Sequence, residues 1–339
     1  MYQKLGAALL ALATLAAAEV KIVVAAGGPH TWASNAEALG QYRKAAANAV
    51  IVAPGSDQEL AREIADADAV IGGVTPEVFS KARKLRWLQT ISAGVEAYGW
   101  KEFVESPVVL TNCKIVQGPT IADHAMSMLL AHTRGLKRFF SEQLREEWSR
   151  NGEGLTELQD MTAVVIGVGG IGSQIAQRAH AFGMTVIGVD PKDIPASTAI
   201  SRVVPPDQLD GVLPLADVVF VAAPLTTQSR HMLGARQFDL MKNGSYLIAV
   251  SRGELYDTAA LVKALDSKKL AGAGLDVTAP EPLPKGHALW KFPNVIITPH
   301  VASQSPGSRK RRLEVITENI RRFSRGQGLL NVVDKQKGY

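Results

Sequence analysis

The chain of 339 residues contains a single cysteine, Cys113, and this excludes an intramolecular disulfide framework and a CxxC zinc site. We expect no metal centre. It also lacks a strong excess of charge, because 37 Lys and Arg against 32 Asp and Glu leave a net charge of only +5. That diffuse excess does not predict nucleic-acid binding, although it suits a small anionic substrate. With 46% apolar and 20% charged residues the chain is typical of a globular protein, and its length suits one large or two ordinary domains.

The first eighteen residues have the layout of a secretory signal peptide. Lys4 precedes an uncharged, almost wholly apolar run (5–18) that ends in three alanines. This run is too short for an ordinary membrane span, so no stable span is expected. We therefore predict that residues 1–18 are a signal peptide and that the protein is periplasmic or otherwise exported. A cytoplasmic protein with an Ala- and Leu-rich N-terminal helix is the alternative.

From residue 19 onwards, short β-branched runs alternate with longer amphipathic segments. Alternation of this kind indicates parallel sheets whose strands are joined by crossover helices. The first series has predicted strands at residues 20–24, 49–52, 69–71, 87–91 and 108–111, and predicted helices at 35–47, 57–65 and 76–82.

A long helix is predicted over residues 121–148, and a second alternating series follows it. Its apolar runs lie at residues 162–166, 185–189, 218–222, 246–250, 272–277 and 295–298. Six such runs suit a six-stranded doubly wound sheet. A last amphipathic helix is predicted over residues 308–323. The sequence therefore predicts two α/β domains.

A glycine-rich turn follows the predicted strand at residues 162–166. Its sequence is GxGxxG, in which Gly167 permits the tight turn, Gly169 lets the backbone approach a pyrophosphate, and Gly172 lets the next helix pack closely. Gly170 and Ile171 complete the turn. The helix that follows offers free N–H groups and the positive end of its dipole to an anion.

Asp190 ends the next predicted strand, at residues 185–189, eighteen residues after Gly172. A carboxylate at this position accepts hydrogen bonds from the adenosine ribose and repels a 2′-phosphate. The sequence therefore favours NAD over NADP as cofactor, although Lys192 nearby argues for NADP.

Three segments that could perform chemistry lie just beyond strand ends, where ligands bind in open α/β sheets. They contain Arg252, Glu281 and His300. An imidazole can move a proton near neutral pH, and a carboxylate beside it favours the protonated form. A guanidinium can hold a substrate carboxylate with two hydrogen bonds and polarise the adjacent carbonyl. Together with the cofactor turn, this set predicts hydride transfer to a small 2-oxo acid.

These segments resemble the D-isomer-specific 2-hydroxyacid dehydrogenase family. The resemblance covers residues 19–339 and rests on several motifs in the same order: the glycine turn, Ser251-Arg252-Gly253, DVTAPEPL at residues 276–283, and Thr298-Pro299-His300. Residues 287–290 and 331–334 are similar to glyoxylate/hydroxypyruvate reductases within that family.

The resemblance implies a flavodoxin-like substrate domain (residues 19–120 and 300–339) into which a Rossmann domain that binds NAD (residues 121–299) is inserted. It implies that Arg252, Glu281 and His300 are catalytic, and that Arg252 and His300 also bind substrate. Further residues match family positions that contact substrate or cofactor: Ala93, Gly94 and Val95 for the substrate carboxylate, and Ala223, Pro224, Thr226, Ser251 and Asp276 for the cofactor. A homodimer is also implied, because Trp148 matches a residue that reaches the partner subunit's site in some relatives.

Two departures from the family pattern lie near these residues. Glu96 stands where Asp is usual, and Ala249 stands where Asn is common. The function expected is NAD(H)-dependent reduction of small 2-oxo acids to D-2-hydroxy acids, of the glyoxylate/hydroxypyruvate type. The same motifs allow D-3-phosphoglycerate dehydrogenase as an alternative, and a non-catalytic protein that senses NAD(H) is another.

Overall fold

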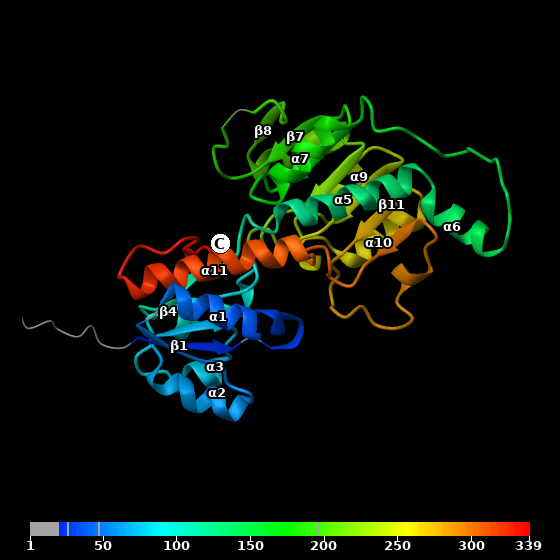
Figure 1. The fold of residues 1–339 in the computed structure, drawn as a ribbon. Helices are drawn as coiled ribbons and strands as arrows, with labels where there is room; N and C mark the ends of the chain where they lie inside the picture. Colours follow the sequence, from blue (N-terminus) through cyan, green and yellow to red (C-terminus); the bar gives the residue numbers. More distant parts are fainter. Residues whose placement is uncertain (1–19, 26, 47, 196) are drawn as a thin grey trace, which may run out of the picture.

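The computed structural model describes residues 20–25, 27–46, 48–195 and 197–339. Two parallel sheets form two α/β units that lie side by side (Figure 1), which confirms the predicted fold class. The predicted signal peptide at residues 1–18 lies outside the described residues. Within the described part of the chain, no helix is both long and apolar enough to cross a membrane.

The first unit is built on a five-stranded sheet with strand order β2-β1-β3-β4-β5. All neighbouring strands are parallel, and the order is that of flavodoxin-like folds. The strands are β1 (Val20–Ala25), β2 (Ala49–Val52), β3 (Ala69–Gly72), β4 (Trp87–Gln89) and β5 (Val109–Thr111). The helices between them are the 3₁₀ helix η1 (Gly28–Ala33), α1 (Ala36–Ala45), α2 (Asp57–Glu63), α3 (Pro76–Phe79) and α4 (Lys101–Val104).

The second unit has a seven-stranded parallel sheet with strand order β12-β11-β10-β9-β6-β7-β8. The strands are β6 (Thr162–Ile166), β7 (Thr185–Val189), β8 (Arg202–Val204), β9 (Val218–Val221), β10 (Ser245–Ala249), β11 (Leu270–Leu275) and β12 (Val295–Ile297). The predicted number of six strands was wrong, because β8 is missing from it. β8 is a three-residue edge strand that begins with an exposed arginine, so it lacks the apolar run that marks a central strand.

The predicted single helix at residues 121–148 was also wrong. The structure has two helices, α5 (Gly118–Thr133) and α6 (Leu136–Leu144), separated at Gly135, whose φ of +64° breaks the helix. α5 buries Ala125, Met128 and Leu129 against the second sheet. α6 extends away from the body of the second unit (Figure 1).

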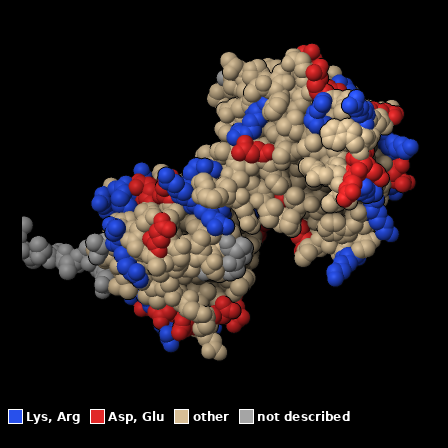
Figure 2. Space-filling model, turned by 45° about the vertical axis from the view of Figure 1, so that its right-hand side comes forward, with Lys and Arg blue, Asp and Glu red and all other residues tan. Residues whose placement is uncertain are grey.

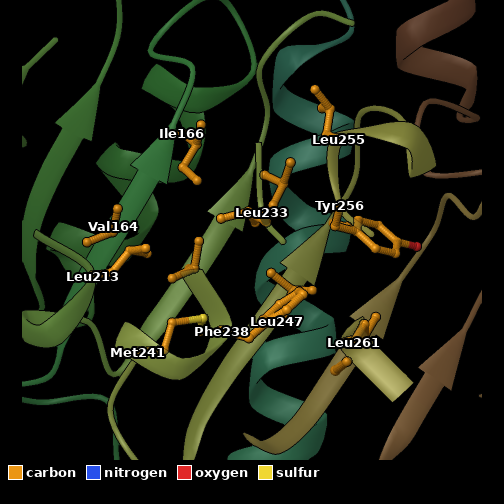
Figure 3. Packing of buried hydrophobic residues seen from close by; sticks show 14 of the residues in the cluster. Val164, Ile166, Leu213, Leu233, Phe238, Met241, Leu247, Leu255, Tyr256 and Leu261 are labelled. Carbon is orange, nitrogen blue, oxygen red and sulfur yellow. The ribbon is translucent and has the colours of Figure 1, made fainter. Parts of the chain in front are cut away.

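The second sheet has a continuous apolar core on its other face. Figure 3 shows side chains from β6 and β10 packing with residues of the covering helices, Leu261 of α10 (Thr258–Asp266) among them. The other helices of this unit are α7 (Gly172–Ala181), α8 (Leu209–Val212) and α9 (Ala235–Leu240).

The last helix, α11 (Pro306–Ser324), returns to the first unit. Its N-terminus is capped by the Ser305 side chain, which accepts a hydrogen bond from Ser308 N. Ile316 and Ile320 are fully buried in the core of the first unit. The predicted domain limits at residues 120 and 299 stay a prediction.

Candidate active site

The glycine turn joins β6 to α7 and is built for close approach of backbone. Gly167 has a φ of +86°, which favours glycine, and a side chain at Gly172 would overlap the Gly167 carbonyl oxygen. At Gly169, by contrast, a Cβ would meet no atom within 4 Å. The turn is therefore packed on two sides and open at Gly169, where Gly170 and Ile171 lead into the N-terminus of α7. This arrangement fits a pyrophosphate.

Asp190 lies at the end of β7 and is tied to the glycine turn. Its Oδ2 accepts a hydrogen bond from Val168 N (2.8 Å) and its Oδ1 accepts one from Lys192 N (2.9 Å). Beside it lies a cavity of about 490 Å³, which includes Asp190, Lys192 and Arg202 in its lining. The carboxylate is thus fixed at the end of β7, and two cationic side chains line the same cavity.

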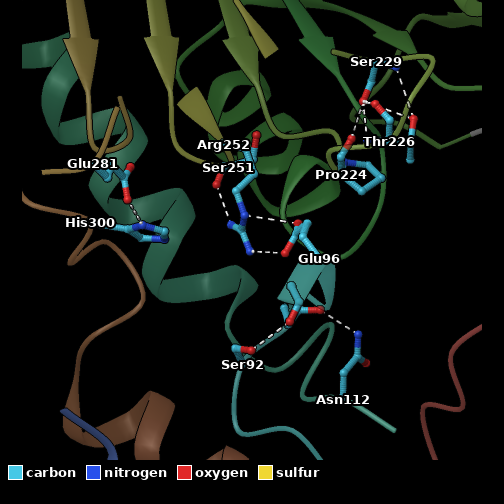
Figure 4. Close-up of polar contacts among 12 residues, drawn as sticks. Ser92, Glu96, Asn112, Pro224, Thr226, Ser229, Ser251, Arg252, Glu281 and His300 are labelled. Atoms are coloured by element: carbon cyan, nitrogen blue, oxygen red, sulfur yellow. Dashed lines mark hydrogen bonds and ion pairs between the residues drawn. The ribbon is translucent and has the colours of Figure 1, made fainter. Parts of the chain in front are cut away.

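The loop after β9 faces the glycine turn, because β6 and β9 are the neighbours between which the strand order reverses. In this loop Ser229 Oγ donates to Pro224 O (2.8 Å) and accepts from Thr226 N (2.8 Å) (Figure 4). Ala223, in the same loop, packs on Gly167. Ser251 is buried and donates to Val221 O (3.1 Å). The predicted cofactor residues of this group are therefore brought together at one edge of the sheet.

His300 and Glu281 form a direct pair, with His300 Nδ1 2.9 Å from Glu281 Oε2 (Figure 4). The other carboxylate oxygen, Oε1, accepts a hydrogen bond from Thr278 N (2.9 Å), so both oxygens of the Glu281 carboxylate have a partner. His300 has a φ of +54°, an uncommon conformation for a residue with a side chain. Its ring is 44% exposed, and Nε2 makes no hydrogen bond to any described residue. Nε2 is therefore available to a ligand.

Asp276, predicted as a cofactor contact, is only 2% exposed. Its oxygens accept hydrogen bonds from Val301 N (2.9 Å), Ala302 N (2.9 Å) and Thr298 Oγ1 (2.5 Å). The structure thus gives Asp276 a positioning role, since it holds the segment that carries His300. His124, on α5, joins this network through Thr298 Oγ1 (2.9 Å). Contact of Asp276 with the cofactor stays a prediction.

Arg252 reaches across to the first unit and pairs with Glu96. Arg252 Nε lies 3.1 Å from Glu96 Oε1, and Nη2 lies 3.1 Å from Oε2, a two-point contact (Figure 4). Arg252 Nη1 also donates to Ser251 O (2.6 Å). The sequence marks Glu96 only as a departure from the family pattern. No sequence signal indicates its pairing with Arg252, which is 156 positions away.

The predicted substrate loop, residues 93–95, follows β4, and two of its carbonyl oxygens accept hydrogen bonds from side chains. Ser92 Oγ donates to Gly94 O (2.8 Å), and Asn112 Nδ2 donates to Ala93 O (2.7 Å). The N–H groups of Ala93, Gly94 and Val95 donate to no described residue. A side chain at Gly94 would overlap the Arg252 guanidinium, so loop and arginine are in contact. Free N–H groups beside a guanidinium fit a carboxylate.

A cavity of about 290 Å³ lies between the two units. Val95, Glu96 and Tyr98 line it from the first unit, and Thr226 and Arg230 line it from the second. Figure 2 shows the hollow that separates the two lobes of the surface. The substrate loop and the loop next to the glycine turn therefore face the same space.

Comparison with known proteins agrees with this geometry. The family model described as "D-isomer specific 2-hydroxyacid dehydrogenase, NAD binding domain" matches residues 126–302. The chain is 33% identical to a D-3-phosphoglycerate dehydrogenase of Methanocaldococcus jannaschii over 284 residues, 82% of this chain and 53% of that protein. It therefore spans about half the length of that relative.

Two further relatives match nearly end to end. A glyoxylate reductase of Korarchaeum cryptofilum is 32% identical over 295 residues, which cover 84% of this chain and 88% of that protein. The structure of an NADPH-dependent glyoxylate/hydroxypyruvate reductase from Sinorhizobium meliloti, in complex with NADP and sulfate, has a TM-score of 0.81 at 25% identity, covering 95% of this chain and all of that one. The chain thus belongs to the D-isomer-specific 2-hydroxyacid dehydrogenases, a family of NAD(P)-dependent oxidoreductases.

Proposed function

We propose that this protein reduces small 2-oxo acids, of the glyoxylate or hydroxypyruvate kind, to D-2-hydroxy acids. The observation that carries the proposal is the His300–Glu281 pair, which leaves His300 Nε2 free. The relatives named glyoxylate reductase support the substrate class.

The polar groups of the candidate site divide this reaction between them. The N–H groups of Ala93, Gly94 and Val95 and the Arg252 guanidinium bind the substrate carboxylate. Protonated His300 gives its Nε2 proton to the carbonyl oxygen as the carbonyl carbon is reduced, and Glu281 holds the imidazolium at Nδ1. Bound nicotinamide cofactor supplies the hydride.

We propose NAD(H) as the preferred cofactor, held by the glycine turn, by the loop of Ala223, Pro224 and Thr226, and by Asp190. The Asp190 carboxylate repels a 2′-phosphate. Lys192 and Arg202 line the same cavity and favour NADP, as does the similar structure with NADP. Comparing NADH with NADPH in one assay decides between them.

D-3-phosphoglycerate dehydrogenase is a second candidate, because the relative from Methanocaldococcus jannaschii carries that name. The two functions differ in the charge of the substrate, so phosphohydroxypyruvate and hydroxypyruvate distinguish them directly.

We also propose a homodimer formed through α6. Leu136, Phe140 and Leu144 recur every fourth residue along α6 and are 37%, 60% and 87% exposed, and Trp148, which follows the helix, is 89% exposed. An exposed apolar stripe of this kind marks an interaction surface. Light scattering of the wild type and of Phe140→Glu tests it, and a monomeric wild type would disprove it.

Export through residues 1–18 is our proposal for location. Mass spectrometry of the protein from its native host gives the mature N-terminus. A start at Glu19 supports export, and retention of Met1 contradicts it.

The decisive experiment follows NADH and NADPH oxidation with glyoxylate, hydroxypyruvate, pyruvate and phosphohydroxypyruvate. We expect His300→Ala to lower kcat by about 10²- to 10⁴-fold, because it removes the proton donor. His180→Ala, an exposed histidine on α7, is the matched control and should leave kcat unchanged. Cofactor binding without turnover on any acid would refute the proposal and favour a non-catalytic NAD(H)-binding protein.

A further inference from the structure

Arg312 is a buried arginine without a counter-ion. It lies on α11 in the first unit and is 3% exposed. Its guanidinium forms no hydrogen bond or ion pair with any described residue, and it lies over the Trp32 ring, with Cζ 4.9 Å from the ring centre. Arg321 and Arg322 on the same helix, by contrast, both pair with Glu318. Burying an unpaired charge costs free energy, and an anion bound to the Arg312 guanidinium would offset this cost.

The charged groups around Arg312 do not supply that partner. Burial lowers the pKa of Arg312, and repulsion by Arg309 and Arg311 lowers it further. Cys113 is the one neighbouring group that could carry negative charge. Burial raises the pKa of the Cys113 thiol to about 12, so this group is neutral at physiological pH. Within the described part of the chain the positive charge is therefore uncompensated.

Other buried polar atoms near Arg312 also lack partners. Ser308 is fully buried, one helical turn before Arg312 on the same face of α11, and its Oγ has no hydrogen bond to a described residue. The same holds for His30 Nδ1, in η1 beside Trp32, and for the hydroxyl of buried Tyr42 in α1. Burial and Arg312 both lower the pKa of His30, so its ring is neutral and has one N–H to donate. These groups share a need for an acceptor.

The position of these residues in the sheet is where a ligand is expected. η1 follows β1 directly, and β1 and β3 are the neighbours between which the strand order of the first sheet reverses. In open α/β sheets, ligands bind at the carboxyl ends of the strands beside such a reversal. α11 lies along α1 (Figure 1). The contact of Arg312 with Trp32 places this part of α11, with Ser308 one turn earlier, beside η1.

We propose that Arg312, Ser308 and His30 form a binding site for a small oxyanion, a carboxylate or a phosphate, inside the first unit. The planar guanidinium has one face on Trp32, which leaves its N–H edge for two oxygens of the anion. The Ser308 hydroxyl and the His30 N–H complete the donor set. This site involves none of the residues assigned to catalysis, and the proposal does not depend on the proposed function.

The test is thermal unfolding of the full chain, without cofactor or substrate, in Tris chloride at constant ionic strength. Sodium phosphate or sodium acetate replaces sodium chloride in steps. Because an anion that binds only the folded state stabilises it, we expect the wild-type Tm to rise by roughly 3 °C or more at a hundredfold excess over Kd. Phosphate and acetate in separate titrations show which oxyanion the site takes.

Three variants make the test specific. Arg312→Met should abolish the rise in Tm, and in chloride alone it should be at least as stable as the wild type, because the unpaired charge is gone. Ser308→Ala should bind the anion about tenfold more weakly, as measured by calorimetry. This variant also tests the site if Arg312→Met fails to fold. Arg325→Met, which changes an exposed arginine at the C-terminal end of the same helix, should respond as the wild type does.

Two results would overturn the proposal. One is a wild-type Tm that neither phosphate nor acetate raises above its value in chloride. The other is an equal response of the wild type and Ser308→Ala or Arg312→Met. Neither result bears on reduction of 2-oxo acids, which is measured separately.

Discussion

Replacement of Glu96 by glutamine should tighten binding of the 2-oxo acid. In the structure the Glu96 carboxylate occupies the Arg252 guanidinium with two contacts of 3.1 Å. The substrate carboxylate is proposed to bind the same guanidinium, and the negative charge of Glu96 would repel it as well. Glu96→Gln keeps the size of the side chain but removes the competing charge, so both effects act in the same direction.

The magnitude follows from the exposure of the pair. Two unit charges at about 4 Å attract with about 4 kcal/mol at an effective dielectric constant of 20, but hydration offsets most of this when the groups are partly exposed. Arg252 is 27% and Glu96 33% exposed. Exposed pairs contribute about 0.2–1 kcal/mol, and a two-point contact places this one near the upper end, at about 1 kcal/mol. That corresponds to roughly a fivefold lower KM.

The assay is steady-state reduction of the best 2-oxo acid at saturating cofactor. We expect kcat to stay within about twofold, because Ser251 O still holds Arg252. Glu102→Gln is the control, since it removes the same charge from an exposed position on α4 of the same unit. An increase in KM for Glu96→Gln would refute the reasoning and show that Glu96 orients Arg252 for the substrate.

Three further predictions concern the cofactor turn, the His300 anchor and the buried thiol. Gly172→Ala should raise the Kd for NADH at least tenfold in a fluorescence titration, because its Cβ overlaps the Gly167 carbonyl; unchanged binding would contradict the assignment of the turn. Asp276→Asn should lower the free energy of unfolding by about 2–3 kcal/mol in urea, since it disrupts buried hydrogen bonds to a charged group, and an unchanged midpoint would argue against the anchor role. Burial raises the pKa of the Cys113 thiol to about 12, whereas a thiol in the unfolded chain has a pKa of about 8.5. Between these two pH values only the unfolded state loses the proton. The free energy of unfolding therefore falls as the pH rises through that range. Cys113→Ala should therefore show a shallower loss of stability in alkaline urea titrations, by at most about 1.4 kcal/mol per pH unit, and identical slopes would contradict this.

The fold could be predicted from the sequence wherever an element carries its own periodic signal. The predicted strands at 162–166 and 185–189 coincide with β6 and β7, because each is an apolar run between turn residues. The errors lie where that signal is weak. Gly135 breaks the predicted long helix because its φ is positive, whereas a single glycine does not interrupt the helical periodicity of the sequence. β8 is too short and too exposed to show an apolar pattern.

The site could be predicted in the parts where each residue follows a strand end. Residues at the ends of neighbouring parallel strands meet at one edge, and this places the Glu281 and His300 segments together. The sheet order does not say what crosses from the other unit, so the contact between Glu96 and Arg252 had no basis in the sequence. The sequence also did not indicate the positioning role of Asp276. Its place in the motif predicts a contact with the cofactor, whereas its hydrogen bonds in the structure hold the segment that carries His300.

The division of the site between two units has a chemical consequence. The residues proposed to bind cofactor, together with Arg252 and Glu281, belong to the second unit, and His300 follows the last strand of that unit, β12. Glu96 and the free N–H groups of Ala93, Gly94 and Val95 belong to the first unit. Without substrate, the pair of Glu96 with Arg252 already joins the two units at the cavity between them. A carboxylate that enters exchanges one anion at Arg252 for another, so the units stay bridged while the free N–H groups gain an acceptor. If a 2-oxo acid binds as proposed, its binding free energy at Arg252 is the difference between its own carboxylate and that of Glu96. Glu96 would then contribute to substrate selection alongside the loop.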